Sequence, residues 1–514
     1  KRVTFNMDPG SYFFMFTETE AKSSQINVGD IMSGTPLALR PTINGTGYKM
    51  FKFHNSNIII DQSANLDDPN DPYNQLVATN SKINIESDVT ITGTKDNQIG
   101  VQGISNGYWA WSSSANSGTI DLKGNNSIGI FAKSTLFSSN GRISVGKNST
   151  AIYVLPEKRD QSSAANSGTI TLGENSIGMY IYKPWVDVGA SIENKDGKIE
   201  SVANNVIGMF ADVRNQKNDP ASPDNENLIL SNYDYAKITL KGDKSIGMYV
   251  TGKGSTKMFN KGNIIMGNSS EKNNPSIGMF SVNPLTEGFN EVGGVIKVGM
   301  NSIGMAGING GKLTNEGEII ITGNRGIGMY LADGTEGINE GTIKTDGAGL
   351  KDVIGVIVGK GSKFTNEAGA VIDITSVNGK GVVFESGAVV ENNGEIKVNG
   401  TDVSMEEVAV RPVTVKAMSN RITPVKSDLG IYMNSLGKTN PIEGLANLGF
   451  KNAELSIGAE ATEKTNATEV AVTGDVLDPF NKSIKKSNIA DWTVKSGSLV
   501  WEAEPEIKDN NIEK

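Results

Sequence analysis

The chain has 514 residues, of which 60 are glycine, one is histidine and none is cysteine. Without cysteine there is no disulfide framework and no thiolate metal site, and the single imidazole of His54 cannot build a multi-histidine metal site. The 48 basic side chains are outnumbered by 57 acidic ones, so the chain has no basic field that would attract a nucleic acid. No apolar run is long enough to span a membrane, so we expect no direct membrane insertion by this segment.

Residues 1–95 form the first predicted section, in which we expect irregular β-helical coils and an acidic loop. His54 lies in the alternating segment 50–55, and we expect it at the surface or in a ladder of stacked side chains, not in a catalytic site. Acidic residues at 67–71, and again at 219–226, supply the oxygen ligands that calcium prefers, but neither segment has the spacing of an EF-hand. We therefore expect solvated loops, with no metal site, no catalytic residue and no cofactor.

Residues 96–400 are dominated by a repeat whose most regular part reads Asn-x-Ser-Ile-Gly-Met-Tyr/Phe. The glycine of this motif recurs after about 28 residues on average, with steps from 22 to 39, which indicates a fixed unit carrying insertions of different length. The glycine position is occupied in turn by Gly100, Gly129, Ala151, Gly178, Gly208, Gly247, Gly278, Gly304, Gly328, Gly355 and Gly381.

A second motif, Asn-x-Gly-x-Ile-x-Ile/Val/Leu, precedes most copies of the first, as at 116–122 and 315–321. The Asn-x-Gly predicts a turn, and the alternating apolar residues after it predict a half-buried strand. A looser strand precedes the asparagine, as at 255–259. Three short strands and three corners per repeat predict an all-β fold, namely a right-handed parallel β-helix with about 28 residues per coil, projecting loops and about eighteen coils.

Strict alternation along the Ser-Ile-Gly-Met-Tyr strand predicts internal ladders of Ile and Met, with the glycine and the aromatic residue outside the coil. We expect the aromatic residues to stack as an outer ladder that covers the glycines. A ligand platform is the alternative interpretation of this ladder. We expect the asparagines at successive corners to form an amide ladder from coil to coil.

Insertions after the Ser-Ile-Gly-Met-Tyr strand should stack along one edge of the rod, where they make a variable surface. These insertions carry several aromatic residues that suit binding to a sugar or a protein receptor. The alternative is that the rings fold back onto the coil. The insertions span 102–115, 133–139, 154–165, 181–193, 211–235 and 281–288, and the candidate ligand-binding residues are Tyr108, Trp109, Trp111, Tyr182 and Trp185.

Residues 401–501 are expected to form a less regular C-terminal β-helical block. The segments 429–432 and 457–459 keep the repeat motif in weakened form, so we expect the solenoid to continue through this block. The charged, aperiodic residues 502–514 are expected to be a linker or boundary.

The Asn-Ser-Ile-Gly-Met-Tyr coils, alternating with Asn-x-Gly-Thr-Ile strands, resemble the passenger domains of the large type V autotransporter adhesins of the fusobacterial kind. The resemblance covers nearly the whole chain. It includes a C-terminal run, at 429–432, 439–445, 458–461 and 491–501, similar to a block that such adhesins carry in the passenger.

The resemblance implies a segment at the cell surface, tethered to the bacterial outer membrane by a C-terminal β-barrel that is not in this sequence. Family members mediate coaggregation with other bacteria and adhesion to host cells, through surface glycans or protein receptors that include immune-cell receptors. The expected function is therefore that of an extracellular, non-enzymatic adhesin passenger. Two alternatives stay open: a passive stalk that spaces a distal binding tip, and a β-helical polysaccharide lyase or hydrolase.

Overall fold

The computed structural model describes most of residues 57–408 and isolated strands on either side. The described residues are 4–6, 12–17, 25–27, 42–44, 49–54, 57–61, 63–68, 77–79, 82–96, 98–104, 113–156, 162–183, 189–213, 228–270, 275–408, 428–433, 452–457, 491–496, 499–502, 507–508 and 511–512. They contain strands and turns, with no helix among them, and hence no helix long and apolar enough to cross a membrane.

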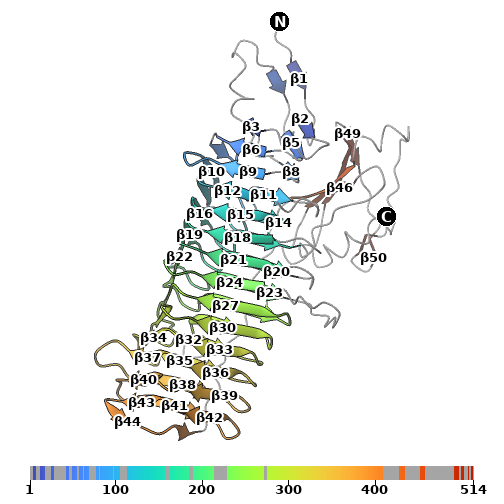
Figure 1. The fold of residues 1–514 in the computed structure, drawn as a ribbon. Helices are drawn as coiled ribbons and strands as arrows, with labels where there is room; N and C mark the ends of the chain where they lie inside the picture. Colours follow the sequence, from blue (N-terminus) through green and yellow to red (C-terminus); the bar gives the residue numbers. More distant parts are fainter. Residues whose placement is uncertain are drawn as a thin grey trace. The chain divides into compact units, whose positions relative to one another are not determined.

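The chain divides into two compact units, Lys1–Phe137 with Ser144–Ser149 and Asn420–Lys514, and Ser138–Ile143 with Thr150–Ser419. The second unit consists of three parallel sheets, which the chain visits in a fixed order (Figure 1).

Sheet I holds the Ser-Ile-Gly-Met-Tyr strands. Its strands in the second unit are, in spatial order, β17 (Thr150–Leu155), β20 (Ile177–Lys183), β23 (Ile207–Val213), β26 (Ile246–Gly252), β29 (Ile277–Ser281), β32 (Ile303–Gly307), β35 (Ile327–Leu331), β38 (Ile354–Val358), β41 (Lys380–Phe384) and β45 (Glu406–Glu407).

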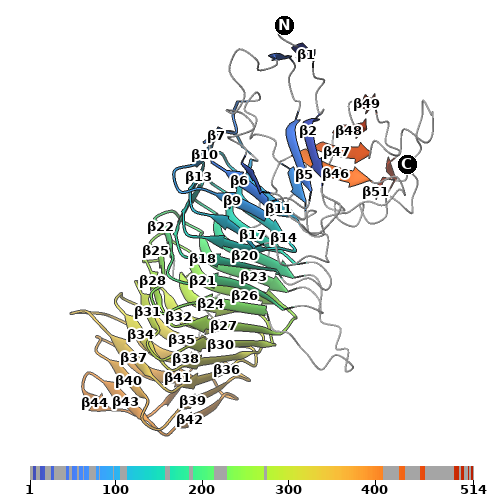
Figure 2. The same cartoon turned by 45° about the horizontal axis from the view of Figure 1, so that its top comes forward.

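Sheet II holds the strands that end at the repeated asparagine, and sheet III holds those that follow the turn. Figures 1 and 2 both show β21, β24, β27 and β30 of sheet II side by side. Sheet II contains β18 (Ser162–Asn166), β21 (Ala190–Asn194), β24 (Leu228–Asn232), β27 (Thr256–Asn260), β30 (Thr286–Asn290), β33 (Lys312–Asn315), β36 (Glu336–Asn339), β39 (Lys363–Asn366) and β42 (Val389–Asn392). Sheet III contains β19 (Thr169–Leu172), β22 (Lys198–Ser201), β25 (Lys237–Leu240), β28 (Asn263–Met266), β31 (Val295–Val298), β34 (Glu318–Ile321), β37 (Thr342–Thr345), β40 (Val371–Ile374), β43 (Glu395–Val398) and the antiparallel β44 (Thr401–Asp402).

The first unit contains coils of the same kind and three smaller sheets. Its coil strands are β2 (Tyr12–Thr17), β3 (Gln25–Asn27), β5 (Lys49–His54), β6 (Asn57–Ile60), β7 (Ala64–Asn65), β8 (Val77–Thr79), β9 (Lys82–Ile85), β10 (Thr90–Gly93), β11 (Ile99–Ile104), β12 (Ser113–Asn116), β13 (Thr119–Leu122) and β14 (Ile128–Lys133). Two of the smaller sheets have two strands each, β1 (Thr4–Asn6) with β4 (Thr42–Asn44) and β50 (Ile507–Lys508) with β51 (Asn511–Ile512). The third has four strands in the order β46 (Asp428–Met433), β47 (Asn452–Ile457), β48 (Asp491–Ser496) and β49 (Leu499–Glu502). Residues of β15 (Leu136–Ser139) and β16 (Arg142–Val145) are divided between the two units.

The predicted parallel β-helix is confirmed, with about 27 residues per turn. In the part of the chain that the structure describes, the three long sheets contain 14 or 15 strands each, which is fewer than the eighteen coils expected from length. One reason is that β46–β49 form a sheet of their own, with β49 antiparallel, in place of joining the three long sheets. The proposed section boundaries at residues 95, 400 and 501 stay predictions.

The repeat motif aligns from coil to coil. On sheet I, Ile177 pairs with Ile207, and Met179 pairs with Met209. The methionines are fully buried, as predicted, because they face sheet II. For example, the Cε of Met279 lies 3.9 Å from the place that a Cβ on Gly288 of β30 would occupy.

The isoleucine position is less internal than predicted. It is buried in the middle coils but partly exposed at Ile327 and Ile354. In β41 the position is occupied by Lys380, whose ammonium lies 2.7 Å from a carboxylate oxygen of Glu406. A strand position that accepts a charged side chain cannot lie fully inside the apolar core.

The amide ladder is confirmed and continuous in the second unit. Each asparagine Nδ2 donates to the Oδ1 of the asparagine in the next coil at 2.7–2.9 Å, and the side chains from Asn166 to Asn366 are buried. The ladder runs through Asn166, Asn194, Asn232, Asn260, Asn290, Asn315, Asn339, Asn366 and Asn392.

Asparagine has a second role at the corner before sheet I. There it adopts a left-handed backbone, with φ between 53° and 60° at Asn126, Asn148, Asn175, Asn205 and Asn301. Asparagine tolerates this conformation better than most residues with a side chain. Lys244, Arg325 and Asp352 adopt the same conformation in other coils, so asparagine is common at this corner but not required there.

The repeated glycine does not point outward, and that prediction is wrong. A Cβ on Gly247 would lie 2.5 Å from the carbonyl oxygen of Gly278 and 2.7 Å from the Cγ2 of Ile264, a buried side chain of sheet III. Successive coils and sheet III therefore approach so closely that no side chain fits. The glycine is required for space and not for an unusual φ.

The aromatic ladder forms but is not an exposed surface. Neighbouring rings stack with centroids 4.9–5.1 Å apart, and none of the five is more than 5% exposed. The rings are therefore buried within the protein and do not form an open surface. An open ligand platform is therefore excluded for Tyr153, Tyr180, Phe210, Tyr249 and Phe280.

Candidate functional site

Four of the five predicted ligand-binding residues lie outside the described part of the structure. Tyr108, Trp109 and Trp111 belong to segment 105–112, and Trp185 belongs to segment 184–188. Their role in binding stays a prediction. The strand ends do fix where their segments emerge, since segment 105–112 follows β11 and segment 184–188 follows β20 of sheet I.

Tyr182, the fifth predicted residue, is the penultimate residue of β20 and is half-buried. Its Cα partner in the next coil is Asp212, which is 2% exposed. Burial raises the pKa of the neighbouring Tyr153, and Tyr182 and Asp212 raise it further by their charge. Tyr153 therefore stays a neutral phenol at physiological pH. The structure brings Tyr182 close to this buried group and does not leave it as a fully exposed ring.

The outer row of sheet II carries lysines and glutamates in alternation. Lys257 pairs with Glu287 at 3.4 Å, and Lys363 pairs with Glu336 at 3.2 Å. Lys312 lies between the two glutamates in register. Ion pairs on an exposed surface contribute little stability, but the alternation favours one register of the coils over a slipped one.

A row of carboxylates lies at the corner between sheets II and III. The backbone N–H groups of Glu291, Glu316, Glu340 and Glu367 donate to asparagine carbonyls of the preceding coil, so the four residues are stacked in register. Burial raises the pKa of Glu316, and the charges of Glu340 and Glu291 raise it further. Within the described ranges no group of three or more acidic or histidine side chains is arranged to hold a metal ion.

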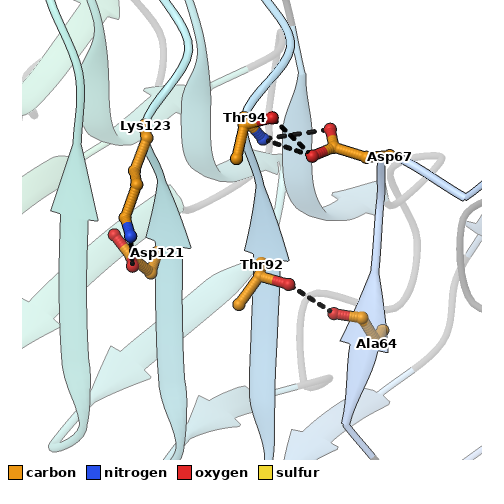
Figure 3. Close-up of polar contacts among 6 residues, drawn as sticks. All are labelled: Ala64, Asp67, Thr92, Thr94, Asp121 and Lys123. Atoms are coloured by element: carbon orange, nitrogen blue, oxygen red, sulfur yellow. Dashed lines mark hydrogen bonds and ion pairs between the residues drawn. The ribbon is translucent and has the colours of Figure 1, made fainter.

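Asp67, in the predicted acidic loop, connects two coils of the first unit (Figure 3). Its carboxylate accepts hydrogen bonds from the N–H and Oγ1 of Thr94, which Figure 3 shows. It also accepts hydrogen bonds from the N–H of Lys95 and from the Nε2 of Gln98. These bonds, the Thr94 bonds foremost, lower the pKa of Asp67 to about 2. The same view shows Thr92 bonded to the Ala64 carbonyl and Lys123 beside Asp121. Asp67 thus serves as a link between coils.

We expect Asp67→Asn to lower the thermal unfolding midpoint of this part of the chain slightly at pH 7. The native pKa is below the value in an unfolded chain, so the contribution of the carboxylate is present at neutral pH and is lost as pH falls through about 4 towards about 2. Thermal melts of both proteins between pH 7 and pH 2 measure this. A difference between the two proteins that does not shrink at low pH would contradict the assigned role.

An exposed turn that is not among the predicted site residues links β24 to β25. Tyr233 is 40% exposed and Tyr235 is 85% exposed. The N–H of Ala236 donates to the carbonyl of Tyr233 at 2.9 Å, so the turn is closed by the backbone. The sequence does mark this turn, because Asn232-Tyr-Asp-Tyr-Ala stands where other coils have the small Asn-x-Gly turn. In the sequence pattern these tyrosines fall at the end of the expected insertion at 211–235.

Comparison with known proteins agrees with the fold. Residues 186–344 match a family model described as the third pectate lyase-like domain of BigA, a family of bacterial surface proteins. No curated protein and no solved structure matches the chain. The matched part is similar to a β-helical domain of a bacterial surface protein. It includes the exposed turn at Tyr233 and Tyr235.

Two kinds of surface are candidate sites: the segments that follow the strands of sheet I, and the exposed tyrosine turn at the corner of sheets II and III.

Proposed function

We propose that the chain is the passenger segment of a bacterial adhesin, displayed outside the cell and tethered to the outer membrane. It binds a glycan or protein receptor on a host cell or on another bacterium, through loops that project from the β-helical rod. The candidate contact residues are Tyr108, Trp109, Trp111, Tyr182 and Trp185.

The observation that carries this proposal is the uneven length of the coils around a constant scaffold. Asn194 bonds to Asn232 after 38 residues, and Asn315 bonds to Asn339 after 24, with nearly equal distances of 2.9 and 2.8 Å. The additional residues fall mainly at one corner, since 214–227 connect β23 to β24, whereas 253–255 connect β26 to β27. Variable loops on a rigid repeat scaffold are typical of binding surfaces, and the likeness to a bacterial surface protein supports the location.

The test is adhesion of the purified chain to host cells and to other bacteria, together with binding to a glycan array. We expect saturable binding that falls at least about tenfold when Trp109, Trp111 and Trp185 are replaced by alanine, because buried aromatic anchors dominate such contacts. A matched variant replaces Trp492 and Trp501, which lie on β48 and β49. Binding unaffected by the loop variant would contradict the loop site, and a chain that binds no cell would support a passive stalk.

A second candidate, a polysaccharide lyase or hydrolase, is favoured by the likeness of residues 186–344 to a pectate lyase-like domain. Catalysis of this kind needs carboxylates or a basic residue gathered in one groove. Incubation with pectate and glycosaminoglycans, followed by measurement of unsaturated products and new reducing ends, tests it. Product formation above that of a heat-denatured sample would replace the adhesin proposal by an enzymatic one.

A further inference from the structure

The exposed turn between β24 and β25 carries two aromatic rings that the fold does not use. Tyr235 is 85% exposed, whereas the ladder rings of sheet I are at most 5% exposed. A phenol has a large apolar face, so the protein gains little by holding it in water. Exposed tyrosines on a closed turn are typical of contact surfaces.

Two lysines lie side by side where this turn enters sheet III. Lys198 and Lys237 are Cα partners in adjacent parallel strands, and both are exposed. Like charges directly opposite one another destabilise a sheet. Folding therefore gives no reason for this pair.

Neither of these two lysines has an acidic partner within 4.0 Å in the part of the chain that the structure describes, in contrast to their neighbours. Lys195 pairs with Glu193 at 3.4 Å, and Lys261 pairs with Glu291 at 3.4 Å. The adjacent charges are thus neutralised locally. The pair Lys198 and Lys237 is left able to bind an external anion.

We infer that Tyr233, Tyr235, Lys198 and Lys237 form a binding site for an acidic saccharide. The sugar carboxylate lies between the two ammonium groups and relieves their repulsion, and the apolar face of the pyranose packs on the ring of Tyr235. Tyr235 stands two residues before Lys237, so ring and charge are presented by one turn. The inference rests on the proposed adhesin function and specifies a ligand class for it, at a site apart from the tryptophan segments.

A saccharide fits this surface better than a protein does. A stable protein interface buries roughly 800 Å² on each partner and is centred on well-packed anchors. Here two rings, the two lysines and Asp234 between the rings stand exposed at one corner, next to lysines that already have ion-pair partners. One or two sugar residues would cover such a site.

The test measures binding of 3′-sialyllactose, of a hyaluronan tetrasaccharide and of neutral lactose to the purified chain by calorimetry. We expect at least one acidic sugar to bind, with an affinity that falls as salt is raised, and lactose not to bind. Replacing both lysines, Lys198→Gln with Lys237→Gln, should weaken binding at least about tenfold. Tyr235→Ala should weaken it by about tenfold as well.

The lysine variant also separates a binding role from a structural one. Because it removes a like-charge pair, its thermal midpoint should stay equal or rise while affinity falls. The matched control replaces Lys257 and Lys363 by glutamine, since both are partly exposed and have ion-pair partners on sheet II. The control should bind as the original chain does.

The inference is overturned if the acidic sugars do not bind, if they bind the double lysine variant equally well, or if lactose binds as tightly. A protein ligand that requires Lys198 and Lys237 while no sugar binds would also overturn it. The proposed adhesin function and this site fail in different ways. If the chain binds the acidic sugar but adheres to no cell, the adhesin function is refuted. If the chain adheres to cells through Trp109, Trp111 and Trp185 but binds no acidic sugar, only this site is refuted.

Discussion

Replacing Asn260 by leucine is expected to lower the free energy of unfolding by about 2–6 kcal/mol. Asn260 accepts a hydrogen bond from Asn232 at 2.8 Å and donates one to Asn290 at 2.7 Å, and all three side chains are buried. Leucine has a similar size but neither makes nor receives these bonds. Two buried polar groups lose their ladder partner at once, each at a cost of about 1–3 kcal/mol. Urea unfolding followed by circular dichroism measures the loss.

The control for this change is Asn393→Leu. Asn393 is exposed, and its Nδ2 donates a 3.1 Å hydrogen bond to the carboxylate of Glu391 at the surface. We expect a change within about 0.5 kcal/mol. Equal losses in the two variants would show that the ladder contributes nothing specific.

The variant Asn260→Asp adds a pH signature. A carboxylate can still accept from Asn232, but it cannot donate to the Oδ1 of Asn290 until it is protonated. Burial raises the pKa of such a carboxyl above that of the unfolded chain, so the loss of stability is present at neutral pH and is relieved as pH falls through the native value. This variant should therefore gain stability relative to the original chain between pH 7 and pH 4.

The second large effect is expected for Gly247→Ala. The added Cβ would lie 2.5 Å from the carbonyl oxygen of Gly278 and 2.7 Å from Ile264, far closer than carbon atoms approach in folded proteins. The first contact is with backbone, which cannot rotate away as a side chain can. We expect a loss of about 3 kcal/mol or more, at the upper end of the range for overpacked cores.

Gly103→Ala is the matched control, because its added Cβ would meet only the Cγ2 of Thr135 at an ordinary 3.5 Å. Unfolding of both variants in urea gives the comparison. If Gly247→Ala were as stable as the control, the close approach of coils at this glycine would be refuted.

The parts of the fold that were predictable are those set by periodicity. The spacing of the motif and the alternation after Asn-x-Gly specify three strands and three corners per coil, and the stacked asparagines follow from their constant place in that pattern. The methionine ladder was predictable for the same reason, because Met179 and Met209 occupy the same step of the alternation.

The errors arose where strict alternation fails. The register between β20 and β23 passes over Gly178 and Gly208, and the bulk that faces Gly178 comes from Ile199 on another sheet. A single sequence does not show how closely two sheets approach at a corner. It also does not show how deeply an outer row of side chains is buried, which is why a ligand platform stayed open as an interpretation of the ladder that contains Tyr180 and Tyr249.

The candidate site was predictable only in its chemistry. Aromatic residues in insertions were a clear signal, and that signal selected Trp109 and Trp185. The turn at Tyr233 and Tyr235 was missed because its role depends on Lys198, a residue of the preceding coil that only the stacking brings alongside Lys237.

The amide ladder keeps its bond lengths whether 24 or 38 residues separate two of its members. Foreign sequence could therefore be grafted at the corner between sheets I and II without changing the repeat on either side. A rod of this kind would serve as a display scaffold, on which several grafted peptides are held at intervals set by the rise of one coil.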